Sequence, residues 1–183
     1  PIPSLLAFSA IHHYLIQCYK RVQTALIVES AEPREVEHFA LLIGFGASAV
    51  CPYMAFAVID DLVTNKKVQL DYDTVEKHYI KALDKGLLKI MSKSGISTLR
   101  SYRAAQMFES IGLSSELLDA YFKGITSPIE GITLKELAKN TITALKLGFP
   151  DEPNQVNSDS ELGDWGNLIY RKGGEIHAWS PKT

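Results

Sequence analysis

The sequence Val-Gln-Thr-Ala-Leu-Ile-Val-Glu-Ser at residues 22–30, followed by Ala-Ser-Ala-Val-Cys-Pro at residues 47–52, decides the fold class. Each stretch contains a short apolar run, which in the first is closed by Glu29 and Ser30, and such runs are typical of strands buried on both faces. The segment between them carries apolar residues at helical spacing and ends at Gly44 and Gly46. This order of strand, helix and strand predicts two parallel strands joined by a helical crossover.

The remaining sequence adds helices and one more strand. A closed eight-stranded α/β barrel needs roughly 200 residues or more, so we expect an incomplete barrel-like arc of parallel strands, followed by extra helices and an irregular tail from residue 148. The other expected elements are a helix from Ser4 to about Lys20, a helix over 53–63, a long helix capped by Asp73 and Glu76 and ended by Ser94-Gly95, a strand over 96–99, a helix over 102–111, and helices capped by Ser114 and Thr133.

The composition excludes several classes of protein. The 183 residues include 19 basic and 21 acidic side chains, a net charge of −2, and 46% of the residues are apolar. These values disfavour a disordered chain and a nucleic-acid binder that relies on phosphate contacts. The apolar stretch 39–59 is broken by glycines and Pro52, so we expect no membrane-spanning helix. Because the chain begins at Pro1, we interpret it as a piece of a larger polypeptide.

The motifs that could carry chemistry all have simpler interpretations. Gly44-Phe-Gly46 stands after a helix and before a strand, whereas a phosphate-binding loop needs the reverse order. Glu35 and His38 have the spacing of a di-iron ligand pair, but no second pair exists, so a polar packing contact is favoured. His12 and His13 are adjacent and would point about 100° apart on a helix. We therefore expect no metal site and no complete catalytic set.

Chemistry in α/β barrels sits at the carboxyl ends of the strands, and three such ends are expected here. They follow residues 28, 50 and 99. Glu29 and Arg34 could equally form an ion pair with each other, and Cys51 could be either a core thiol or, less favoured, a nucleophile. The candidates for residues that face a neighbouring domain or an internal tunnel are Glu29, Arg34, Cys51, Tyr53, Ser97, Ser101, Tyr102, Arg103 and Gln106.

An ordered series of short motifs makes the chain recognisable. The motifs are Leu26-Ile-Val-Glu-Ser30, Arg34-Glu-Val, His38-Phe-Ala-Leu-Leu-Ile-Gly44, Pro52-Tyr53, Ala55-Phe56, Lys85-Gly-Leu-Leu-Lys89, Met91-Ser-Lys93, Gly95-Ile-Ser-Thr-Leu99, Ser101-Tyr-Arg103 and Ala105-Gln106. With these motifs in this order, the chain resembles the glutamate synthase family, large subunit, over residues 3–146, with a weaker match at 173–177.

The resemblance implies a position within a large enzyme. Residues 1–94 would be the end of a central, incomplete α/β barrel, residues 95–147 the start of the FMN-binding synthase domain, and residues 148–183 a linker. Enzymes of the family transfer glutamine-derived ammonia through a tunnel to 2-oxoglutarate and form glutamate reductively on FMN. Electrons reach FMN through an iron–sulfur cluster from NADPH, NADH or ferredoxin. The implied partners of this piece are the flanking amidotransferase and FMN domains, and in addition a small subunit or ferredoxin.

The same resemblance implies that this piece lacks the catalytic machinery and serves an interdomain role. We expect it to bind neither FMN nor the cluster by itself, and we expect a cytoplasmic location, or a plastid in a photosynthetic eukaryote. The sequence departs from the usual family pattern at Ala31, Ser48, Cys51, Ser94 and Ala104, where the family has Gly, Asp, Asn, Met and Gly.

Two alternatives remain open at this stage. The first is a stand-alone, non-catalytic scaffold or interaction domain derived from the same fold. The second is a small α/β enzyme that uses Glu29, Tyr102 and Arg103.

Overall fold

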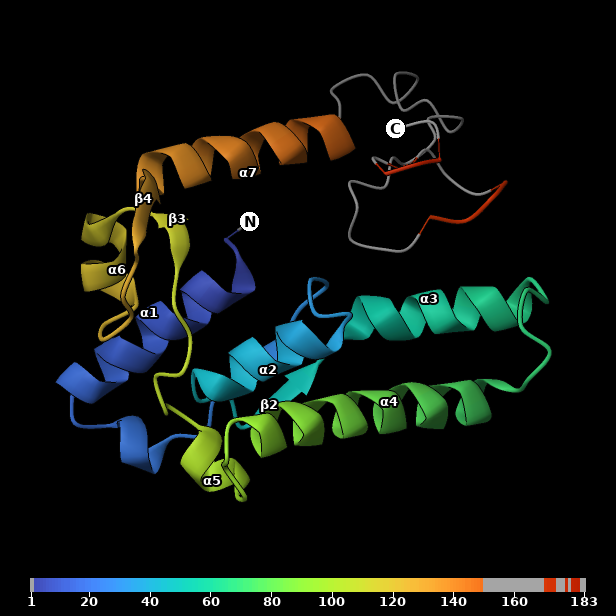
Figure 1. Cartoon of the computed structure of the whole chain (residues 1–183), viewed down its shortest axis with the longest axis horizontal. Coiled ribbons are helices and arrows are strands. Elements are labelled where there is room, and N and C mark those ends of the chain that lie inside the picture. Colours follow the sequence, from blue (N-terminus) through green and yellow to red (C-terminus); the bar gives the residue numbers. More distant parts are fainter. Residues whose placement is uncertain (1, 150–169, 174–176, 178, 182–183) are drawn as a thin grey trace. The chain divides into compact units, whose positions relative to one another are not determined.

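A computed structural model describes residues 2–149, 170–173, 177 and 179–181 (Figure 1). The chain divides into two compact units, Pro1–Thr141 and Ile142–Thr183. Its helices are α1 (Ser4–Gln17), the short 3-10 helix η1 (Arg21–Gln23), α2 (Val36–Gly44), α3 (Tyr53–Thr64), α4 (Tyr72–Lys93), α5 (Leu99–Tyr102), α6 (Ser115–Tyr121) and α7 (Leu134–Gly148). Its strands are β1 (Ile27–Glu29), β2 (Ala49–Cys51), β3 (Ile111–Leu113) and β4 (Ile129–Ile132).

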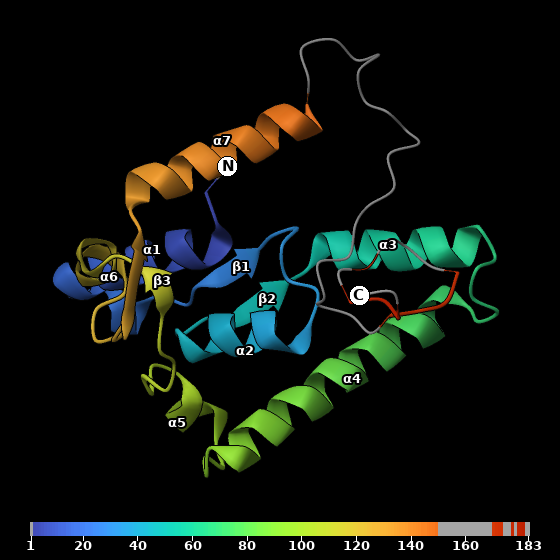
Figure 2. The same cartoon turned by 45° about the horizontal axis from the view of Figure 1, so that its top comes forward.

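The strands β1 and β2 form a parallel pair with α2 as the crossover, which confirms the predicted unit (Figure 2). Ile27 pairs with Ala49 and Glu29 pairs with Cys51. Burial on both faces was the wrong expectation for β1. Val28 is buried against α1 and α2, but Ile27 is 70% exposed, because the described sheet has two strands and helices pack on only one of its faces. The other face of this sheet is open.

A second parallel pair, β3 and β4, has α6 as its crossover. Ile111 pairs with Ile129, and the register is irregular between Ile111 and Leu113. Gly131 lies so close to the backbone of Gly112 that a Cβ atom there would collide with it. The described residues therefore form two short parallel sheets and no closed barrel, in agreement with a partial α/β arc.

Two predicted elements between the sheets were wrong. Residues 96–99 do not form a strand, because the Thr98 side chain accepts a hydrogen bond from the Ser101 backbone N–H and begins α5 instead. The predicted helix over 102–111 is absent, because α5 ends at Tyr102 and Ala104 takes a left-handed conformation with φ = 56°. The chain from there to β3 is a loop.

Helix α1 contributes to both hydrophobic cores of the first unit. Phe8 packs with Val28 and Leu42 in one core, and Leu6 packs with Leu117, Leu118 and Phe122 in the other. The buried Ser9 hydroxyl adds a hydrogen bond to the Tyr121 carbonyl at 2.5 Å. Ser4 is the first helical residue, as expected, and its backbone N–H donates to the Glu32 carboxylate at 2.8 Å.

Helices α3 and α4 form an antiparallel hairpin that contacts α2 through α4 (Figure 1). The cap of α4 is Asp71 rather than Asp73, because the Asp71 carboxylate accepts the Thr74 backbone N–H at 3.0 Å. Gly86 permits the close approach of α4 to α2, since a Cβ atom at this position would collide with Val36. The predicted end at Ser94-Gly95 is confirmed, with Gly95 at φ = 70°.

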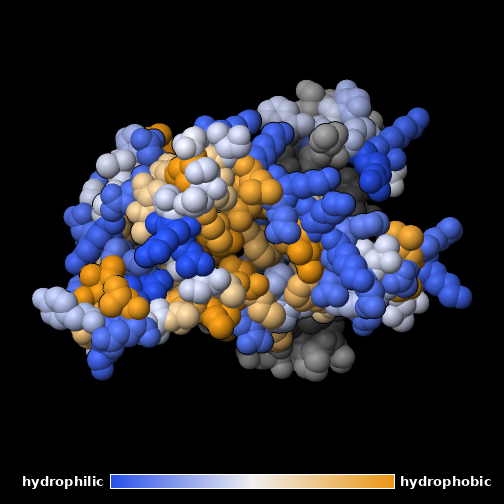
Figure 3. Space-filling model, turned by 90° about the horizontal axis from the view of Figure 1, so that it is seen from below, coloured by the Kyte–Doolittle hydropathy of each residue, from blue (hydrophilic) through white to orange (hydrophobic). Residues whose placement is uncertain are grey.

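The surface retains much apolar area. In Figure 3, apolar side chains form a broad area beside charged ones. The exposed large apolar side chains of the first unit include Ile2, Ile11, Tyr14, Tyr19, Val22, Ile27, Tyr53, Met54, Val58 and Leu88. Scattered exposed apolar residues are normal, but neighbouring ones indicate a surface that another element covers.

Replacement of Ala104 by Gly should stabilise the chain. The Ala104 Cβ is strained at φ = 56°, and this conformation lets its backbone N–H donate to the Gly44 carbonyl at 2.7 Å. We expect Ala104→Gly to raise the free energy of unfolding by about 1 kcal/mol and the melting temperature by about 2–4 °C. Ala105→Gly is the matched control, because Ala105 has no positive φ, and it should cost about 0.4–1 kcal/mol. Equal destabilisation by both variants in thermal melts would contradict this reading.

Candidate functional site

The carboxyl edge of β1 and β2 brings three of the predicted site residues together. Glu29 and Cys51 are paired neighbours, and the Ser30 backbone N–H donates to the Cys51 carbonyl at 3.2 Å. Tyr53 follows after Pro52 as the first residue of α3 and is about half exposed, and Glu29 is exposed as well. A carboxylate, a partly buried thiol and a phenol therefore share one edge, beside the open face of the sheet. Such an edge can form polar contacts to a docking element.

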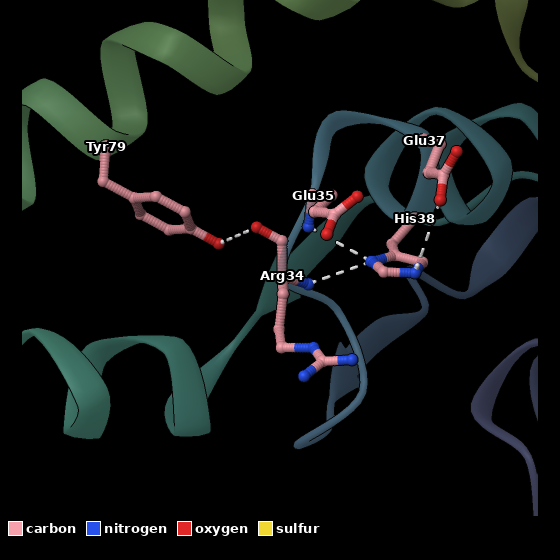
Figure 4. Close-up of polar contacts among 5 residues, drawn as sticks. All are labelled: Arg34, Glu35, Glu37, His38 and Tyr79. Atoms are coloured by element: carbon pink, nitrogen blue, oxygen red, sulfur yellow. Dashed lines mark hydrogen bonds and ion pairs between the residues drawn. The ribbon is translucent and has the colours of Figure 1, made fainter. Parts of the chain in front are cut away.

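Arg34 lies in the loop between β1 and α2, and its backbone is held in place from two sides (Figure 4). The His38 Nδ1 accepts the backbone N–H groups of Arg34 and Glu35, each at 3.1 Å. The Tyr79 hydroxyl of α4 donates to the Arg34 carbonyl at 2.9 Å. The Glu35 and His38 motif is thus a polar packing contact at the start of α2, as favoured above. The Arg34 guanidinium extends away from Tyr79 (Figure 4) and forms no ion pair with Glu29 within the described structure.

The other predicted site residues lie at the far end of α2, beside its C-terminus. The Tyr102 side chain is fully buried, and its hydroxyl donates to the Ala40 carbonyl at 3.0 Å. The Arg103 Nε is buried and has no hydrogen-bond partner among the described residues. Ser101 and Ser97 are exposed, and the Thr98 hydroxyl donates to Ser101 Oγ at 2.8 Å. Because residues 96–99 are not a strand, the structure does not bring this group to the edge that holds Glu29.

Gln106 lines a cavity that the sequence did not reveal. The cavity has a volume of about 180 Å³ and is bounded by α1, the end of α2, the loop after α5 and the loop after α6. Its polar lining residues are His12, His13, Gln106 and Lys123. The adjacent histidines were the one feature of the sequence that could have pointed to this cavity. The other segments that form it lie some 90 to 110 positions later, and no local sequence pattern connects those segments with the histidines.

Arg21 contacts His12 directly and influences the protonation of its ring. Its Nε–H donates to His12 Nδ1 at 2.9 Å, while its other nitrogens donate to the carbonyls of Thr24 at 2.7 Å and Gly46 at 2.8 Å. Burial, followed by the positive charge of Arg21 and the neighbouring His13, lowers the pKa of His12 from 6.5 to about 4. Burial and, second, Lys123 lower the pKa of His13. Both rings are therefore held toward the neutral form at neutral pH.

The described residues include no ready metal site and no helix that could span a membrane. No three His, Cys, Asp or Glu side chains in residues 2–149 and the described part of the tail lie close enough together to hold one ion. The helices described here are too polar or too short to cross a bilayer.

The depressed pKa of His12 predicts how stability depends on pH. The unfolded chain takes up a proton on this ring near pH 6.5, while the folded chain does so only near pH 4, so stability is full above about 6.5 and falls as the pH drops toward 4. We expect His12→Asn to reduce the change in the free energy of unfolding between pH 6.5 and pH 4 by about 1–2 kcal/mol. This is less than the full pKa shift implies, because the ring is half exposed. Urea melts at several pH values measure the slope, and an unchanged slope in the variant would refute the assignment.

Comparison with known proteins places this chain within a family of large enzymes. The profile of the family described as "Glutamate synthase central domain" matches residues 1–114. The chain is 40% identical over 183 residues to the glutamate synthase [NADPH] large chain of Bacillus subtilis, all of this chain aligning with 12% of that protein. It is 39% identical to the glutamate synthase [NADH] of Schizosaccharomyces pombe, covering 9% of it.

A third relative is the chloroplastic ferredoxin-dependent glutamate synthase of Spinacia oleracea, which is 38% identical over 191 residues. The alignment includes 99% of this chain and 12% of that protein. The chain thus spans about one eighth or less of the length of these relatives. The profile match and the full-length alignments together show that the chain belongs to the glutamate synthase central domain family.

Proposed function

We propose that this chain is the interdomain part of a glutamate synthase and holds the amidotransferase and FMN domains in register. The parent enzyme would transfer glutamine-derived ammonia to 2-oxoglutarate and form glutamate reductively. The support is that the whole of this chain aligns with a segment of much longer relatives named glutamate synthase. Correct relative placement matters for such an enzyme, because a small displacement of reacting groups can cost about a hundredfold in rate.

The open face of the β1–β2 sheet is the observation that carries this proposal. A two-stranded sheet is marginal by itself and gains stability from further strands or from packing elements. Ile27 and Ala49 are paired on this face and are both exposed, whereas Val28 on the other face is buried beneath helices. In a barrel arc the helices cover the outside, so the open face corresponds to the barrel interior. A neighbouring part of the parent chain would cover it.

A groove beside β1 supports the same docking region. It has a volume of about 280 Å³ and lies between α1 and the strand that includes Ile27. Its apolar walls include Ile2, Ile11 and Leu26, and Glu29 and Ser30 contribute polar groups. The side of β1 away from β2 has no strand partner in the described structure. We infer that the parent chain adds a further strand or an apolar segment at this place.

We also propose the domain division given above, with the end of the central domain at residues 1–94, the start of the FMN domain at 95–147 and a linker at 148–183. The β1–α2–β2 unit and the α3–α4 hairpin fall in the first part. The β3–α6–β4 unit falls in the second part, so the boundary separates the two small sheets. Residues 150–169 of the linker lie outside the described residues.

FMN and the iron–sulfur cluster of the parent enzyme would bind elsewhere in it. A cluster needs about four cysteine thiolates, whereas this chain has two cysteines, one exposed at the end of α1 and one in β2. Gly44 and Gly46 end a helix and are followed by a strand, so they do not form a phosphate-binding helix start. These residues therefore do not fit either group.

The proposed partners follow from the same position. The relatives are named as NADPH, NADH and ferredoxin-dependent enzymes, so the electron donor of the parent would be one of these, delivered by a small subunit or by ferredoxin. The proposed location is the cytoplasm, or the plastid in a photosynthetic eukaryote.

A charge on the open face should impair the parent enzyme. Ile27→Lys introduces an ammonium where we expect a neighbouring domain to pack, and burial of an unpaired charge costs several kcal/mol. In the full-length enzyme, we expect less glutamate formed for each glutamine hydrolysed, because ammonia is lost to water. Leu88→Lys on α4 is the matched control, since Leu88 is 63% exposed and Ile27 is 70% exposed.

The measurement is the ratio of glutamate formed to glutamine consumed in each variant. The control variant should keep the ratio of the unmodified enzyme. If Ile27→Lys also keeps it, while both variants are folded, the open face is not an interdomain surface and the proposal fails.

A further inference from the structure

The cavity at His12 and His13 is open to solvent on one side and is lined by segments that are far apart in the sequence. Its apolar wall consists of Ile16, Phe45, Phe108 and Ile125 in addition to Gly44 and Ala104. Phe45 and Phe108 stack with ring centroids 6.1 Å apart and an interplanar angle of 14°. An apolar cavity of about 150 Å³ is large enough to hold benzene, so the volume here of about 180 Å³ suits a molecule of about that size.

The polar side of the cavity is cationic. Lys123 is exposed and lines the cavity, and after burial its positive charge contributes to the lowered pKa of His13. None of the described residues that line the cavity is Asp or Glu. Because His12 Nδ1 accepts the Arg21 Nε–H, the neutral His12 ring carries its own proton on Nε2. The cavity thus combines one positive charge with uncharged donors and has no carboxylate to neutralise it.

The backbone conformation around Gln106 determines the shape of this side of the cavity. Gln106 has φ = 53°, which is a costly conformation for a residue with a side chain. Gly124 lies against the Gln106 amide and has φ = 87°, and a Cβ atom there would collide with that amide. The Ala104 backbone N–H also anchors this loop to the Gly44 carbonyl. The Gln106 amide therefore packs against the Gly124 backbone at this side of the cavity, and the Ala104–Gly44 hydrogen bond fixes the backbone of the loop before it.

We propose that this cavity binds a small monocarboxylate, with the apolar body against the wall formed by Phe45, Phe108 and the isoleucines and the carboxylate at Lys123, His13 and Gln106. A single ammonium matches a single negative charge, and the larger apolar wall excludes a fully hydrated dianion such as phosphate. This binding site is separate from the β1–β2 open face and does not depend on the interdomain role proposed above.

The test uses 4-fluorobenzoate as the probe and observes its fluorine signal in NMR relaxation titrations. The protein is the full-length enzyme that contains this chain, in unmodified form and as Lys123→Gln. Lys81→Gln on α4 is the matched control, because Lys81 is also exposed but does not line the cavity. The neutral analogue 4-fluorobenzyl alcohol tests the need for the carboxylate.

We expect a saturable binding component that Lys123→Gln weakens about tenfold or more, since a hydrogen bond to a charged group contributes about 1.5–3 kcal/mol. Lys81→Gln should leave that component unchanged, and the alcohol should lack it. Both lysines are exposed, so both variants should fold, which circular dichroism checks. The absence of a component that depends on Lys123, or equally tight binding of the alcohol, would overturn the proposal.

Discussion

Packing of helix α1 against two separate cores holds the first unit together. Each of the two parallel sheets has only two strands of three or four residues and could not persist alone. Helix α1 buries Phe8 against the first sheet and Leu6 against α6, which connects the strands of the second. Leu5 and Phe45 contact both cores and so connect them. Because the helices cover one face of β1 and β2, the same packing that stabilises the arc leaves its other face open.

The strand–helix–strand unit could be predicted from the sequence because its signals are local: two apolar runs, a helical stripe between them and glycines at the helix end. Helix caps at Ser114 and Thr133 were confirmed for the same reason, since a side-chain oxygen and the N–H groups it accepts lie three positions apart. The strand expected over 96–99 does not form, because Thr98 caps the start of α5. At these residues the helix cap outweighs their preference for a β-strand. Strand β3 went unrecognised because Ile111-Gly-Leu113 is too short to show a period.

The candidate site was predictable only where it depended on strand order. Glu29 and Cys51 meet because parallel strands end at the same edge, which any correct prediction of β1 and β2 implies. The group around Tyr102 was misplaced because it was expected at the carboxyl end of a strand over 96–99, and this strand does not form. The cavity at His12 could not be foreseen, since it forms only when residues 104–108 and 123–125 fold against α1. The edge of β1 and β2 belongs to an open surface that needs a partner, whereas the cavity at His12 is formed by residues of this chain alone.

The claim at the centre of this account is that the open face of β1 and β2 is covered in the parent enzyme. Hydroxyl-radical footprinting measures this directly, because the oxidation rate of a side chain follows its access to solvent. Ile27 should be oxidised readily in the isolated chain and strongly protected in the full-length enzyme, while Leu88, which is similarly exposed in this chain, should be oxidised at the same rate in both. Equal oxidation of Ile27 in the two proteins would contradict the account.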